Sequence, residues 1–141
     1  MCQLLALTFD ERVTTSLSFR GFRHRSDCNP HGWGLATFDG HNASIVKEPC
    51  RADESDEVES IVNNHNLSSK IFVGHVRHGN IGGISQQNTH PFVQKLRGMD
   101  LVLAHNGTLK SDQPKSHVDG RYKPDGTTDS PSLAERPHFR A

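Results

Sequence analysis

Cys2 is the first residue of the sequence with the chemistry needed to break an amide bond. A small residue at this position permits removal of Met1, and Cys2 would then carry both a thiol and a free α-amine. The thiolate would attack a carbonyl carbon, while the amine, with a reference pKa of about 8, would accept and return the proton. The ordinary alternative is that Cys2 serves only as a small apolar residue. The hypothesis of a nucleophile therefore depends on partner residues elsewhere in the sequence.

Two later segments contain the groups that such a nucleophile needs. Arg77 ends the apolar segment 71–77, where its guanidinium could bind a substrate carboxylate through two hydrogen bonds. Asn106 and Gly107 follow the apolar run 100–104, and a side-chain amide and a backbone N–H there could stabilise one oxyanion. Each segment also has an ordinary interpretation, namely a surface arginine at a strand end and an Asn-Gly hairpin turn.

Metal and phosphate sites are alternatives, because the chain has 10 His and 3 Cys. The glycine-rich stretch 79–85 matches no phosphate-binding loop, and we expect it to lie as a flexible loop over a pocket. The sequence has no C-x-x-C and no H-E-x-x-H motif. His75 and His78 are three residues apart on an expected strand and so face opposite sides. We therefore expect no metal and no cofactor.

Taken together, these segments resemble the class II glutamine amidotransferases, which use an N-terminal cysteine nucleophile, and especially their stand-alone YafJ-type group. The resemblance is carried by motifs in the order of the family: Met-Cys-Gln-Leu-Leu at 1–5, Phe-Arg-Gly-Phe-Arg at 19–23, His-Gly-Trp-Gly-Leu-Ala at 31–36, Gly-His-Val-Arg at 74–77, Asn-Thr-His-Pro-Phe at 88–92, Ala-His-Asn-Gly at 104–107 and Asp-Gly-Thr-Thr-Asp-Ser at 125–130.

The resemblance implies a role for each residue at a motif position. Cys2 would be nucleophile and general base, and Asn106 and Gly107 would form the oxyanion hole. Arg77 would bind the substrate carboxylate, His90 would shape the pocket, and Asp129 would bind the substrate ammonium group. All six residues stand at motif positions of this sequence. The implied reaction is hydrolysis of the γ-amide of glutamine, or of a related γ-glutamyl compound, through a thioester on the cysteine.

The resemblance also implies the fold, an α+β, Ntn-hydrolase-like αββα sandwich of antiparallel sheets, which we expect to be incomplete in this chain. It covers residues 1–130, which we expect to be the N-terminal part of a glutamine amidotransferase type-2 domain. Residues 131–141 contain two prolines and no amphipathic period, and are expected to form a divergent, disordered tail. A truncated domain leaves another function open, that of a catalytically inactive fragment or interaction module.

Hydrophobic periodicity predicts the elements that must position these residues. The expected strands are 2–9, 33–38, 43–47, 71–77 and 100–104, and the expected helices are 17–25 and 53–67. The second helix has the clearest signal, because Val58, Ile61 and Val62 recur at helical spacing after an acidic first turn. Residues 110–127 are expected to be a loop. Because only 33% of the residues are hydrophobic, we expect half a domain to leave apolar sheet surface uncovered.

Charge and apolar runs exclude other classes of protein. The 16 Lys and Arg balance the 16 Asp and Glu, which argues against a nucleic-acid-binding surface. No apolar run reaches membrane-spanning length and no signal peptide is evident, so we expect a cytoplasmic location. The expected partners are L-glutamine or a γ-glutamyl substrate, with a separate ammonia-accepting enzyme or a second copy of the chain as candidate protein partners. The sequence does not distinguish glutamine from a γ-glutamyl peptide.

Overall fold

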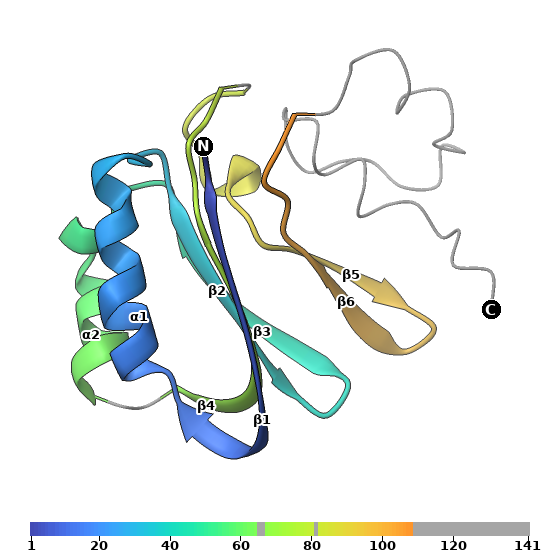
Figure 1. Cartoon of the computed structure of the whole chain (residues 1–141). Helices are drawn as coiled ribbons and strands as arrows, with labels where there is room; N and C mark the ends of the chain where they lie inside the picture. Colours follow the sequence, from blue (N-terminus) through green and yellow to red (C-terminus); the bar gives the residue numbers. More distant parts are fainter. Residues whose placement is uncertain (65–66, 81, 109–141) are drawn as a thin grey trace, which may run out of the picture.

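A computed structural model describes residues 1–64, 67–80 and 82–108, which fold into helices and antiparallel sheets of the α+β class (Figure 1). The strands are β1 (Gln3–Thr14), β2 (Trp33–Asp39), β3 (Asn42–Glu48), β4 (Ser68–Val76), β5 (Phe92–Leu96) and β6 (Met99–Leu103). The α-helices are α1 (Ser16–Arg23) and α2 (Asp56–Asn64), and short 3-10 helices lie at His24–Asp27, Ala52–Glu54 and Gln86–Asn88.

Four strands form one antiparallel sheet in the order β1-β4-β2-β3, and β5 and β6 form a separate antiparallel hairpin. β4 is central, since it pairs with β1 through Gln3 and with β2 through Trp33, both opposite Val76. Figure 1 shows α1 and α2 together on one side of this sheet and the β5–β6 hairpin on the other. The predicted α+β class with antiparallel sheets is therefore confirmed.

The hydrophobic core lies between the sheet and its two helices. Phe19 of α1 and Val58 of α2 are fully buried against Trp33 and Phe72 of the sheet. The rings of Phe19 and Trp33 meet edge to face with 5.9 Å between centroids. Because side chains alternate along a strand, the side chains of β4 that flank Phe72 point to the opposite face. The site described below lies on that opposite face.

Helix α2 is shorter than the predicted helix over 53–67. It begins at Asp56 because the Ser55 side chain caps it, its Oγ accepting a hydrogen bond from the backbone nitrogen of Val58 at 3.1 Å. Ala52–Glu54, which overlaps the first residues of the predicted helix, forms a separate 3-10 turn. The acidic residues at 53–59 are thus divided between the 3-10 turn and the first turn of α2, with the Ser55 cap between them. The hydrophobic period alone does not reveal this boundary.

The β5–β6 hairpin contains a strand that the sequence pattern did not predict. β5 alternates only weakly between apolar and polar residues, whereas β6 agrees with the predicted strand at 100–104. Arg97 and Gly98 join them with φ values of 51° and 84°, the backbone of a tight two-residue turn. The sequence signal for this hairpin was the pair Arg97-Gly98, which stands between two short runs containing apolar residues.

Part of the sheet face away from the helices is open to solvent. Leu4 of β1 is 46% exposed and Ile71 of β4 is 42% exposed. Both are apolar residues on the face expected to lack a cover. No helix among the described residues is long and apolar enough to cross a membrane.

Candidate active site

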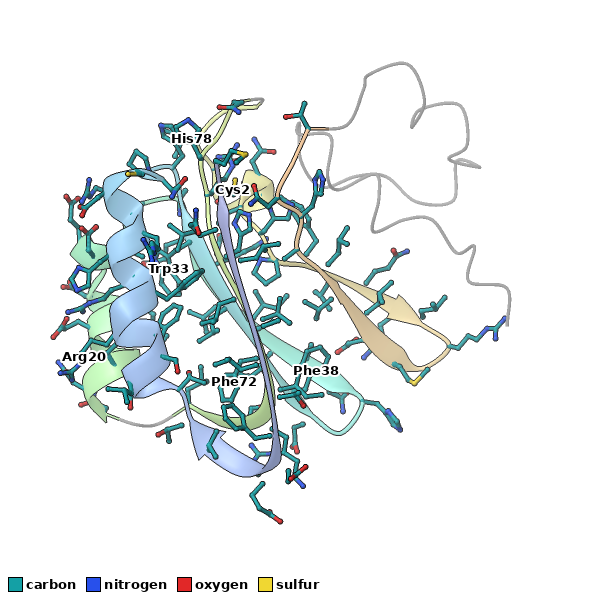
Figure 2. All side chains as sticks on the ribbon, in the orientation of Figure 1. Cys2, Arg20, Trp33, Phe38, Phe72 and His78 are labelled. Atoms are coloured by element: carbon teal, nitrogen blue, oxygen red, sulfur yellow. The ribbon has the colours of Figure 1, made fainter. Side chains whose placement is uncertain are left out.

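Cys2 lies at the end of β1, directly beside the backbone of His78 (Figure 2). The His78 N–H donates to Cys2 Sγ at 3.2 Å, and the thiol donates to the His78 carbonyl at 3.4 Å. Pairing of Gln3 with Val76 sets this position, because the next step of the register brings Cys2 opposite Arg77. The half-buried sulfur is therefore held by both polar groups of the His78 backbone.

Arg77 is buried rather than exposed at a strand end, so the surface interpretation is wrong. Arg77 is only 3% exposed. Its Nη1 donates to the carbonyls of His31 at 3.4 Å and Gly83 at 3.2 Å. Burial lowers the pKa of the guanidinium, while the nearby Cys2 opposes that shift. The site thus keeps a cation close to the cysteine on the same face of the sheet.

The glycine-rich segment after Arg77 packs on this guanidinium. A Cβ built at Gly79 would lie 2.9 Å from Arg77 Cζ, so the backbone approaches the side chain closely. The Gly83 carbonyl accepts from Arg77 Nη1 and also from Asn88 Nδ2, the latter at 3.0 Å. The described part of the predicted loop therefore holds the arginine in place.

His90 and His75 form a buried histidine pair on this face of the sheet. His75 is fully buried and His90 is 5% exposed, with 4.5 Å between their ring centroids. Burial lowers the pKa of His75 to about 4 and that of His90 to about 2. Both rings are therefore neutral at pH 7. Within the described part of the chain, neither ring nitrogen of His90 has a hydrogen-bond partner, nor does His75 Nδ1.

His75 connects this pair to the segment that contains Asn106 and Gly107. His75 Nε2 lies 3.3 Å from the carbonyl oxygen of His105 and must donate, because a carbonyl only accepts. Asn106 and Gly107 are exposed after the end of β6. Neither has the positive φ that a tight Asn-Gly hairpin turn requires, so that interpretation is wrong.

The predicted site residues thus fall into four groups. Cys2 and Arg77 lie together at the ends of adjacent strands, and His90 lies within the buried histidine pair. Asn106 and Gly107 follow the residue that His75 contacts, and their roles stay predictions. Asp129 lies outside the described residues.

Sequence reasoning missed the contribution of His78 and His31. The contact of His78 with Cys2 is made by the backbone, which every residue except proline could supply, so no sequence signal marks it. His31 Nδ1 accepts the N–H of Gly79 at 2.9 Å, a contact between residues 48 positions apart. Within the described residues, no three His, Cys, Asp or Glu side chains gather as metal ligands.

Comparison with known proteins gives one family for the chain. Residues 1–133 match the family described as "Glutamine amidotransferases class-II". An uncharacterized protein of Methanocaldococcus jannaschii is 40% identical over 130 residues, which are 92% of this chain and 36% of that protein. A Haemophilus influenzae protein named "Putative glutamine amidotransferase" is 34% identical over 133 residues, with coverage of 92% and 44%.

A solved structure from Pseudomonas aeruginosa, described as a "predicted glutamine amidotransferase", has a similar fold. It aligns with a TM-score of 0.52 at 31% identity, over 75% of this chain and 42% of that chain. The chain therefore spans less than half the length of these three proteins. The match over residues 1–133 and the shared fold agree with the motifs around Cys2 and Arg77. The chain belongs to the class II glutamine amidotransferase family.

Proposed function

We propose that this chain is an amide hydrolase that cleaves the γ-amide of glutamine, or of a related γ-glutamyl compound, with Cys2 as its nucleophile. The observation that carries the proposal is the contact of Cys2 Sγ with the His78 N–H, next to the buried Arg77. Met1 is 87% exposed, which supports its removal by a processing enzyme. Removal would release the α-amine that serves as the base.

In the first half of the proposed reaction, the substrate amide becomes a thioester. Arg77 binds the α-carboxylate and Asp129 the α-ammonium group, which brings the γ-carbonyl to Cys2. The α-amine takes the thiol proton, Sγ bonds to the carbonyl carbon, and the oxyanion accepts hydrogen bonds from Asn106 and Gly107. The C–N bond then breaks, and the nitrogen leaves as ammonia or an amine after taking the proton from the α-amine.

In the second half, water clears the thioester. The free α-amine of Cys2 accepts a proton from water while the oxygen attacks the thioester carbon, and the oxyanion forms in the same place. Breakage of the C–S bond releases glutamate, and the proton returns to the sulfur. The neutral, buried ring of His90 shapes the pocket and does not transfer a proton in this scheme.

Residues 1–130 would form the N-terminal part of the amidotransferase domain, in agreement with the family match over residues 1–133. Ammonia would pass to a separate acceptor enzyme, and self-association is a second candidate interaction. The cytoplasmic location stays a prediction. The competing function is an inactive fragment that acts as an interaction module, which the uncovered residues Leu4 and Ile71 would favour.

Intact-mass spectrometry tests the proposal most directly. The purified chain is measured before and after exposure to an electrophilic glutamine analogue, with and without excess L-glutamine. We expect loss of Met1 and one adduct on Cys2, prevented by L-glutamine. Cys2→Ala should give no adduct and no turnover, whereas Cys50→Ala, at an exposed free cysteine, should behave like the wild type. Processed protein without an adduct would favour the interaction module.

A further inference from the structure

The ring of His31 contacts the segment that surrounds the cysteine, although the proposed reaction does not use it. Its Nδ1 accepts the N–H of Gly79 at 2.9 Å. Its backbone is paired with Arg77, because the His31 N–H donates to the Arg77 carbonyl at 3.1 Å. Gly79 directly follows His78, whose N–H and carbonyl contact Cys2 Sγ.

We propose that His31 is a positioning residue for Cys2, whose Nδ1 holds the Gly79 N–H and thereby fixes the His78 backbone against the sulfur. The inference rests on the proposed function of Cys2, which it deepens by naming a group that acts through the backbone. His31 is placed in no step of the chemistry and acts through the Gly79 N–H.

The contacts define the protonation state that His31 needs. A backbone N–H only donates, so Nδ1 must be unprotonated and the proton of the neutral ring must be on Nε2. An imidazolium would direct an N–H of its own at the Gly79 N–H and break the contact. Burial, then His78 and Arg77, lowers the pKa of His31, which favours the neutral ring. The His78 ring is 5.3 Å away between centroids.

The segment is also held on its other side. His78 Nδ1 lies 3.0 Å from the carbonyl of Cys28 and donates to it. The His78 backbone is therefore fixed by its own ring and by the following N–H, and Gly79 in turn packs on the Arg77 guanidinium. Loss of the His31 acceptor would leave a half-buried N–H without a partner and release one of these two attachments.

Three substitutions separate positioning from simple packing. His31→Asn keeps an acceptor, since the Asn Oδ1 is attached at the same side-chain depth as Nδ1. His31→Gln has its oxygen one bond farther out, near the place of Nε2, and His31→Ala has no acceptor. We expect His31→Ala and His31→Gln to slow Cys2 alkylation by a neutral haloacetamide about tenfold, and His31→Asn to stay within about threefold of the wild type.

The measurement uses the full chain and mass spectrometry of each cysteine. Exposed Cys50 is the internal standard, so a change in the reagent shows as a change at both residues. Recovery of the rate in His31→Asn separates loss of the acceptor from loss of folding. Acidification should slow Cys2 alkylation more in the wild type than in His31→Asn, because only the wild type loses its acceptor by protonation. Cys2 itself is the same in both proteins, so the ratio of their rates at each pH isolates His31. The titratable and charged groups that face His31 are the His78 ring and Arg77.

The outcomes are distinct. The inference is overturned if His31→Ala equals the wild type, if His31→Asn is as slow as His31→Ala, or if the rate ratio does not change with pH. If alkylation depends on His31 as expected while the glutamine analogue never labels wild-type Cys2, the positioning role stands and the proposed function fails.

Discussion

The backbone nitrogen of His78 lies 3.2 Å from Cys2 Sγ, although the two residues are 76 positions apart in the sequence. The contact follows from the pairing of β1 with β4, which brings the first residues of the chain beside the residue after Arg77. The proposed nucleophile and the proposed carboxylate-binding residue are therefore positioned by the same strand pair. Any change in that pairing would displace one relative to the other.

Arg77→Lys should weaken binding of a substrate carboxylate. A lysine has one compact charged group and cannot present a planar fork of N–H donors to a carboxylate. In the wild type, Nη1 of Arg77 donates to the carbonyls of His31 and Gly83, which orients the guanidinium. We expect KM for glutamine to rise by about tenfold or more, with a much smaller change for an amide that lacks the α-carboxylate. Steady-state kinetics with both substrates test this. Arg12→Lys, at an exposed arginine of β1, is the control. An equal loss for both substrates would contradict the assigned role.

Stability should fall as the pH drops below 6.5, the ordinary pKa of histidine. Burial lowers the pKa of His75 to about 4 and that of His90 to about 2, so the unfolded chain binds protons that the folded chain does not. The stabilisation is fully present above pH 6.5 and is lost as the pH falls toward these values. Each histidine contributes a slope of at most about 1.4 kcal/mol per pH unit.

Urea unfolding between pH 7.5 and pH 5 measures this slope. His75→Asn and His90→Asn should each make the unfolding free energy less dependent on pH. His41→Asn, at an exposed histidine, should leave the slope as it is in the wild type. A wild-type slope near zero over this range would show that the two rings are accessible to protons in the folded chain.

Two glycine substitutions should change stability in opposite directions. A Cβ at Gly34 would meet the His90 carbonyl, with Pro91 Cδ at 2.8 Å and Lys47 Cβ at 2.9 Å, so Gly34→Ala should lower the unfolding free energy by about 3 kcal/mol. Gly21 lies in α1 with no atom within 4 Å of an added Cβ. Gly21→Ala should therefore raise it by about 0.5–1 kcal/mol. Denaturant titration compares them, and a neutral Gly34→Ala would show that the His90 segment shifts freely.

Gly107→Ala should affect turnover more than substrate binding. An added Cβ would lie 2.7 Å from His105 Nε2, so the ring or the backbone must move. If the Gly107 N–H stabilises the oxyanion, kcat should fall by about tenfold or more at nearly constant KM. Gly83→Ala has open space around its Cβ and should retain kcat. A rise in KM alone would place Gly107 in substrate binding instead.

The sequence predicted most of the main sheet because its signals there are local. β2 and β3 are short runs joined by an Asp39-Gly40 turn, and β4 contains the mainly apolar run 71–76. β5 was missed because Phe92–Leu96 is a short strand in which apolar and polar residues do not alternate regularly, so it carries little periodic signal. The burial of Arg77 was not predictable from its position, since backbone carbonyls accept its hydrogen bonds and one of them, that of His31, lies 46 positions away.

The candidate site divides in the same way. Cys2 and Arg77 were identified by residue type and motif, because thiol and guanidinium chemistry belongs to the side chain. The N–H of His78 was not, because a backbone donor is common to nearly all residues. Asn106-Gly107 had two interpretations from sequence, and only the backbone angles excluded the hairpin turn.

The irregular pairing in the middle of β1 divides this strand into two parts with different tolerance to length. From Thr8 to Val13 the strand advances five residues, while its partner advances two, from Ile71 to Ser69. An insertion in this bulge changes only the loop that is already unpaired. An insertion between Cys2 and Thr8 would move the sulfur by about 3.3 Å and turn it to the other face. Within β1, natural length variation or an engineered reporter peptide is therefore compatible with a fixed Cys2 sulfur in the bulge but not between Cys2 and Thr8.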